Sequence, residues 1–181
     1  MKIATPKQIV SFWAKAGPKR WFKKDPAFDQ KIREHFLITH QAAEMDKLGE
    51  WEAEPESALA LVLLLDQFPR NMFRGSQRAF ANDLQARAVT TRAIERGFDQ
   101  KVLKELRSFF YLPFEHSEEL ADQERSMELV RATKDKDLIH WAQIHYDIIK
   151  QFGRFPHRNE ILGRRSTPEE TAFLDEGGFG G

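Results

Sequence analysis

The stretch from Ala58 to Leu65 constrains the fold most, because all eight of its residues are apolar. A helix that is apolar on every face must be surrounded by other elements. A buried strand is the alternative, but the chain offers no partner segment with period-two alternation and no Asn-Gly or Asp-Gly hairpin signal. The run is also far shorter than the ~20 residues that a membrane span needs. We therefore predict a central, buried α-helix in an all-α protein.

Helix start and stop signals recur along the rest of the chain. Thr5-Pro6 and Thr167-Pro168 each open with a capping-box pattern, and glycines follow several amphipathic stretches. We expect seven or eight helices in one all-α domain over residues 1–176, followed by a flexible glycine-rich tail, residues 177–181. Besides the central helix, the expected helices cover about residues 5–16, 25–49, 77–96, 100–110, 118–133 and 137–152, with a short one from 167.

The charge balance argues against a polyanionic partner. Lys plus Arg and Asp plus Glu number 28 each, so no overall field attracts nucleic acid or an anionic membrane. The one basic run, Lys19 to Lys24, is interpreted as a solvated turn with Trp21 and Phe22 directed inward. We expect neither a nucleic-acid nor a membrane partner.

The absence of cysteine excludes several kinds of chemistry. Disulfides, thiolate nucleophiles and cysteine-ligated metal sites all require a residue that this chain lacks. The first residues also lack the apolar core of a signal peptide. Both observations favour a cytoplasmic location.

The first candidate site lies where the apolar helix ends. A polar segment follows directly, and charges at a buried helix end need partners. In the structural interpretation, the two arginines bind orphan helix carbonyls and pair with Asp66 or Asp83. In the functional interpretation they form an anion clamp, since a guanidinium matches carboxylate or phosphate bidentately. The candidate ligand-binding residues here are Asp66, Arg70, Asn71 and Arg74.

The second candidate site is the polar segment around residue 116. Ser117 is expected to cap the following helix, with Glu118 complementing its dipole. Capping leaves Glu115 and His116 unexplained, and we interpret them as a catalytic acid and base.

A metal site is the alternative use of Glu115 and His116, with His140 or His145 as a third ligand. No His-x3-His or His-Glu-x2-His spacing supports it, so we predict no metal ligands. His145 lies near the apolar stripe formed by Leu138, Trp141 and Ile148, and we interpret it as a core residue.

A third cationic segment follows the helix that is expected to end near Gly153. It repeats the Phe-Pro pattern of Phe68-Pro69, and in both segments we expect the proline to stop the helix. If the three segments converge, their arginines would face Glu115 and His116 across one cleft. The candidate ligand-binding residues of this third segment are Arg154, His157, Arg158 and Asn159.

Cofactor and nucleophile motifs are missing. The sequence contains no Gly-x-Gly-x2-Gly run, no phosphate-binding Gly-x4-Gly-Lys-Ser/Thr loop and no Gly-x-Ser-x-Gly elbow. The cofactor therefore stays unknown, and the sequence does not decide whether the protein is an enzyme.

Four runs together resemble one bacterial family, the domain of unknown function 924. They are residues 65–75, residues 80–83, residues 110–118 with Gln123-Glu124, and residues 155–159. Asn82 stands where the family's Phe-Ala-Thr-Asp run has threonine. The resemblance implies an all-α fold of antiparallel, tetratricopeptide-like helical hairpins around the central helix. It implies no activity and no catalytic residues.

Two functions are therefore expected from the sequence. The first is binding of a small anionic ligand, with or without catalysis, in a pocket lined by Arg, Glu and His between helix ends. The alternative is a protein-interaction scaffold of tetratricopeptide-like type that holds a protein partner in a groove.

Overall fold

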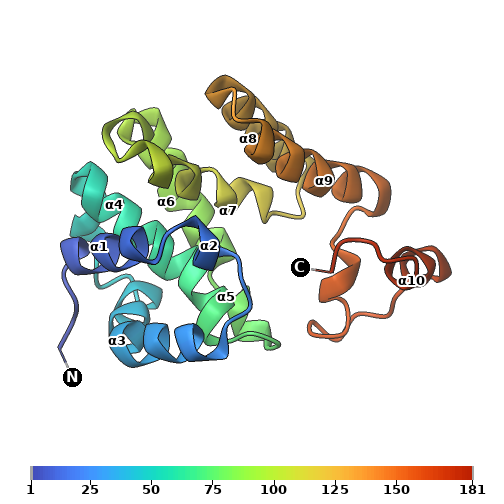
Figure 1. Ribbon diagram of the computed structural model, residues 1–181, viewed down its shortest axis with the longest axis horizontal. Coiled ribbons are helices and arrows are strands. Elements are labelled where there is room, and N and C mark those ends of the chain that lie inside the picture. Colours follow the sequence, from blue (N-terminus) through green and yellow to red (C-terminus); the bar gives the residue numbers. More distant parts are fainter. Residues whose placement is uncertain (1, 181) are drawn as a thin grey trace. The chain divides into compact units, whose positions relative to one another are not determined.

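The computed structural model describes residues 2–180, and every regular element in that range is helical (Figure 1). The all-α prediction is confirmed, whereas the tetratricopeptide-like arrangement stays a prediction. The chain forms two compact units. The first comprises the residues up to Arg74 together with Arg78–Pro113, and the second comprises Gly75–Gln77 together with the chain from Phe114 onward. The prediction of one domain over 1–176 is not decided by this division.

The first unit is built around the apolar run. All residues from Ala58 to Leu65 are buried, and α4 packs against α1 and α6. The predicted central helix is therefore confirmed. The α-helices of this unit are α1 (Pro6–Ala16), α2 (Pro18–Trp21), α3 (Pro26–Glu44), α4 (Pro55–Val62), α5 (Phe68–Met72) and α6 (Asp83–Glu95), with 3₁₀ turns at Gly49–Ala53, Gln77–Ala79, Phe98–Lys101 and Lys104–Phe110.

The central helix does not stop at Pro69 as predicted. A π-helical turn, Leu63–Gln67, joins α4 to α5, and Pro69 lies within α5. The N–H of Phe68 donates to the carbonyl of Leu63, five residues back. In that register the carbonyl of Leu64 faces Pro69, which has no N–H to give. The wider turn therefore carries the chain past the proline and leaves one carbonyl to be satisfied elsewhere.

His40 satisfies that carbonyl. Its Nδ1 lies 2.9 Å from the Leu64 carbonyl oxygen, and its side chain is buried. Since a carbonyl only accepts, Nδ1 must carry the proton. Burial lowers the pKa of His40, so the neutral ring acts as a side-chain substitute for the missing backbone donor.

The second unit contains a helical hairpin and a C-terminal segment. The hairpin consists of α8 (Leu120–Thr133) and α9 (Lys136–Phe152), which pack side by side (Figure 1). A 3₁₀ turn, Pro156–Arg158, and α10 (Pro168–Asp175) follow. The short helix α7 (Leu112–Glu115) connects the two units along the chain.

Capping signals predicted helix starts well where they stood directly before the helix. Thr5 with Gln8 and Thr167 with Glu170 form complete capping boxes, and Gly153 ends α9 in the left-handed region. These predictions are confirmed.

Several predicted boundaries were wrong. The second expected helix ends at Glu44 rather than Gly49, and the helix expected from Gln77 begins at Asp83. Residues 104–110 form a 3₁₀ helix instead of an α-helix. The helix expected from Glu118 begins at Leu120.

Three side-chain predictions were also wrong. Ser117 is not an N-cap, since Glu119 holds that position, although the Ser117 hydroxyl accepts the Glu119 N–H and donates to Asp122. Trp141 is 50% exposed rather than packed inward. In the basic run, Trp21 is buried as predicted but Phe22 is 63% exposed.

Candidate functional site

Arg70 has the partners that the structural interpretation gave it. Its guanidinium donates to both carboxylate oxygens of Asp83, at 2.8 and 2.9 Å, and to the backbone oxygen of Asp66 at 2.9 Å. The Asp66 carboxylate lies 3.2 Å away. Burial alone would lower the pKa of Arg70, but the two carboxylates outweigh it and raise the pKa. The bidentate face of Arg70 is therefore occupied by Asp83.

Arg74 and Asn71 belong to a different group. Arg74 binds both oxygens of Asp29, at 3.0 and 3.2 Å, rather than Asp66 or Asp83. Asn71 donates to Asp29 at 2.8 Å and accepts from Gln67 at 3.1 Å. These side chains border a cavity of 270 Å³. The first polar segment thus divides into an internal ion pair at Arg70 and a cavity wall at Asn71 and Arg74.

In the second unit, Glu115 lies against His145. Their Oε1 and Nδ1 atoms are 3.2 Å apart, and both side chains are buried. The same Nδ1 lies 2.9 Å from the Trp141 carbonyl, which fixes the proton on Nδ1. Burial is the main cause that lowers the pKa of His145 to about 3, and the nearby His116 and Arg158 act in the same direction. His145, interpreted from sequence as a core residue, is therefore a neutral ring beside a buried carboxylate.

His157 is the second neutral ring of this group. Burial and the neighbouring Arg158 lower the pKa of His157 to about 4. Its Nδ1 is buried and has no hydrogen-bond partner among the described residues. The ring of Phe179 contacts both histidines, with centroids 4.7 Å from His145 and 5.3 Å from His157. We call Glu115, His116, His145, His157 and Phe179 the histidine cluster.

Arg158 lies at the edge of the histidine cluster. It donates to the backbone oxygen of His116 at 3.0 Å, and its guanidinium stacks 4.3 Å above the Phe155 ring. The ring of His116 is 6.3 Å from that of His145. Within this unit, the structure thus brings the predicted residues Glu115, His116, His157 and Arg158 together.

Arg154 and Asn159 belong to a neighbouring network of ion pairs. Both donate to Glu170, Arg154 at 2.6 and 2.8 Å and Asn159 at 3.1 Å. The hydrogen bonds from Arg154 lower the pKa of Glu170 to about 2. Asn159 also accepts from Arg164, which holds Glu118 through two hydrogen bonds. Arg154 and Asn159 are therefore occupied by internal partners.

Sequence reasoning missed Glu170, Arg164 and Phe179 as members of these groups, and it placed His145 with Glu115 and His116 only as the third ligand of a metal site that it did not predict. The capping-box pattern indicated Glu170 as a helix-capping residue, but nothing in its sequence spacing indicated its ion pair with Arg154. Phe179 lies in the tail that was expected to be flexible, of which Gly181 lies outside the described residues. Convergence of the Arg70 segment with the other two stays a prediction.

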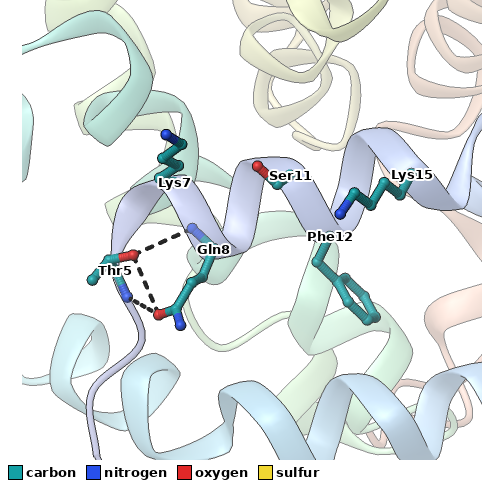
Figure 2. Close-up of a pocket in the computed structure, with 6 residues that line it drawn as sticks. All are labelled: Thr5, Lys7, Gln8, Ser11, Phe12 and Lys15. Carbon is teal, nitrogen blue, oxygen red and sulfur yellow. Dashed lines mark hydrogen bonds between the residues drawn. The ribbon is translucent and has the colours of Figure 1, made fainter.

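A second hollow, of 510 Å³, lies along α1 and is lined by fewer ionisable side chains. Figure 2 shows its lining residues, with Thr5 and Gln8 bonded to each other as the capping box. The remaining lining residues are Lys7, Ser11, Phe12 and Lys15. Since this lining contains no carboxylate or imidazole, we assign no site to it.

Residues 2–180 contain neither a candidate metal-binding group nor a helix that could span a membrane. No group of three or more His, Cys, Asp or Glu side chains is arranged to hold a metal ion. No helix in the same range has the length and apolar character to cross a bilayer.

Comparison with known proteins identifies relatives without an assigned activity. Residues 9–178 match the family described as bacterial protein of unknown function DUF924. The chain is also similar to the solved structure of a protein of unknown function, ATU0120, from Agrobacterium tumefaciens. The two are 50% identical over 95% of this chain and 97% of that chain, with a TM-score of 0.93. No curated protein matches.

Proposed function

Since the chain belongs to the bacterial family DUF924, which has no established function, we propose a function from its own side chains: the histidine cluster binds a small anionic molecule and exchanges a proton with it. The observation that carries this proposal is a pair of neutral, buried histidines, one of which lies beside a buried carboxylate. Burying such groups costs stability unless they are fully paired, and groups with perturbed pKa values concentrate at functional sites.

Arg158 and three members of the cluster, Glu115, His145 and His157, have distinct roles in this proposal. Arg158 supplies positive charge for the anion. The proton on His145 Nδ1 leaves the lone pair on Nε2, which accepts a hydrogen bond from a ligand hydroxyl or takes its proton. Glu115 stabilises the imidazolium that such a transfer would form. His157 offers a ring nitrogen that has no other partner within the described residues.

The test combines ligand screening with a matched pair of variants. Purified protein is screened by thermal shift against phosphorylated metabolites, carboxylates and nucleotides, because a ligand at 100 times its dissociation constant adds about 2.7 kcal/mol of stability. We expect a ligand whose shift disappears in Glu115→Gln and His157→Gln. His140→Gln is the control, because His140 is exposed on the same helix as His145.

Histidine NMR makes the result specific to the cluster. On titration with the ligand, the ring signals of His145 and His157 should move while that of His140 stays in place. A ligand that shifts none of the cluster histidines, or retains its thermal shift in both cluster variants, would place binding elsewhere and contradict the proposal.

A protein-interaction function is the second candidate, and Trp141 is the residue that favours it. A half-exposed tryptophan on α9 is a typical anchor for a partner. If this function is correct, Trp141→Ser should abolish capture of a partner from cell lysate while leaving the melting temperature unchanged. We also propose a cytoplasmic location, because the chain contains no cysteine.

A further inference from the structure

The 270 Å³ cavity in the first unit carries an excess of positive charge. Lys24, Arg33 and Arg74 line it together with one acidic side chain, Asp29. Asp29 is already engaged by Arg74 and Asn71. Among the described residues, neither Lys24 nor Arg33 forms an ion pair. Two positive charges on this wall are therefore uncompensated.

Two of the three cationic side chains, those of Arg33 and Arg74, are held in place before any ligand arrives. Arg74 is fixed by its two hydrogen bonds to Asp29, and Asn71 ties Asp29 to the buried Gln67. The guanidinium of Arg33 packs over the Phe73 ring, 5.3 Å from its centroid. Groups that are already ordered lose little conformational entropy on binding, so such a wall favours affinity.

The remaining lining suits the uncharged part of a small molecule. Pro26 and Met72 provide apolar surface, and Gln30 provides an amide. The volume is near the lower end of ligand pockets, so the ligand must be small. A phosphate monoester carries a charge of about −1.5 to −2 near neutral pH, which matches the two uncompensated cations.

We propose that this cavity is a binding site for a small phosphate monoester, with the phosphate between Lys24 and Arg33 and beside Arg74. The site is separate from the histidine cluster and does not depend on the function proposed for that cluster. Arginine recognises phosphate through paired hydrogen bonds, and lysine acts as a point charge.

Isothermal titration of the full chain with glycerol 3-phosphate at low ionic strength tests the proposal. We expect saturable binding, with glycerol giving no heat and succinate binding at least tenfold more weakly. Arg33→Gln and Lys24→Gln should each raise the dissociation constant at least tenfold. Lys47→Gln removes an exposed charge of the same unit that does not line the cavity, and it should change the constant less than twofold.

Several results would overturn the proposal. Absence of binding at millimolar glycerol 3-phosphate would remove the site, and equal losses in all three variants would reduce it to general charge attraction. Succinate binding as tightly as the phosphate ester would refute the phosphate assignment. His157→Gln should leave this binding unchanged, and loss of binding in that variant would move the ligand to the histidine cluster.

Discussion

Two Phe-Pro segments of the chain build the same three-part arrangement. After Phe68-Pro69, Asn71 donates to Asp29, which takes two nitrogens of Arg74. After Phe155-Pro156, Asn159 donates to Glu170, which takes two nitrogens of Arg154. In both segments an asparagine thus orients a distant carboxylate that fixes an arginine.

The two arrangements differ in what surrounds the carboxylate. Glu170 is 2% exposed and also accepts the Thr167 N–H, so its hydrogen bonds are all internal. Asp29 borders a cavity, and the side chain of its partner Arg74 is 39% exposed. The same arrangement of asparagine, carboxylate and arginine therefore holds α10 in place around Glu170 and forms part of an open cavity wall around Asp29. The second segment is also one residue longer than the first: His157 lies between Pro156 and Arg158, whereas Arg70 follows Pro69 directly.

The largest expected effect comes from the histidines that accompany the second segment. His145 and His157 have folded pKa values of about 3 and about 4, below the unfolded value of 6.5. Below pH 6.5 the unfolded chain therefore binds more protons, and stability is lost as pH falls toward those folded values. At pH 5 each histidine should cost about 2 kcal/mol relative to pH 8, which is about 4 kcal/mol for the two together.

Chemical denaturation at several pH values measures that loss. His145→Gln and His157→Gln should each flatten the acid limb, whereas His35→Gln, which replaces an exposed histidine of the first unit, should not. Below pH 4.5 a further loss should appear as Glu170 becomes protonated in the unfolded chain, because its folded pKa is about 2. An acid limb unchanged by both cluster variants would show that these rings titrate normally.

The next largest effect compares the two carboxylates directly. Glu170→Gln removes a buried acceptor of charged hydrogen bonds, and we expect it to lower the free energy of unfolding by about 2–3 kcal/mol. Asp29→Asn should cost about 1 kcal/mol or less, because Arg74 can turn toward solvent. Urea denaturation at pH 7 measures both. If the two variants lose the same unfolding free energy, the distinction between Glu170 as an internal acceptor and Asp29 as part of a cavity wall is wrong.

A smaller effect concerns the C-terminal tail. Gly177 has φ +84°, and a Cβ at Gly178 would lie 2.5 Å from the Phe173 carbonyl oxygen. This close approach folds the tail back and brings Phe179 to the two histidines. Gly178→Ala should therefore displace Phe179 at a cost of about 1–2 kcal/mol.

Histidine NMR reports the displacement of Phe179. In Gly178→Ala and in Phe179→Ala, the pKa values of His145 and His157 should rise, because their rings become hydrated. Gly180→Ala is the matched control, since a Cβ there meets nothing within 4 Å. If Gly178→Ala leaves both histidine pKa values unchanged, Phe179 does not shield the rings.

The sequence predicted those features that depend on neighbouring residues. The apolar run identified the central helix, the capping boxes located two helix starts, and the need of a buried helix end for charge partners anticipated the pairing of Arg70 with Asp66. Contacts between distant positions carried no such signal. Glu115 meets His145 thirty residues later, and Arg74 meets Asp29 forty-five residues earlier. Such pairs follow from how the helices pack, which spacing does not encode.

Pro69 shows that a prediction from neighbouring residues also fails where a distant residue intervenes. Proline predicts a helix end because its ring clashes with the carbonyl four residues earlier and because it lacks an N–H. The π-turn at Leu63–Gln67 relieves this conflict, and His40 supplies the missing donor from another helix. At Pro156 the proline begins a 3₁₀ turn, where no donor is required.

The smallest expected effect is a coupling energy of about 1 kcal/mol, which tests this difference between the two prolines. His40→Leu leaves the Leu64 carbonyl unsatisfied and should cost about 2 kcal/mol. In a Pro69→Ala background, residue 69 regains an N–H that can bond to Leu64, so the same change should cost about 1 kcal/mol. A double-mutant cycle by urea denaturation would give a coupling energy of about 1 kcal/mol. Pro156→Ala is the control and should show no coupling to His40, since Pro156 begins its turn. If the Pro69 cycle also gives no coupling, His40 does not replace a backbone donor, and the two Phe-Pro segments differ only in what surrounds their carboxylates.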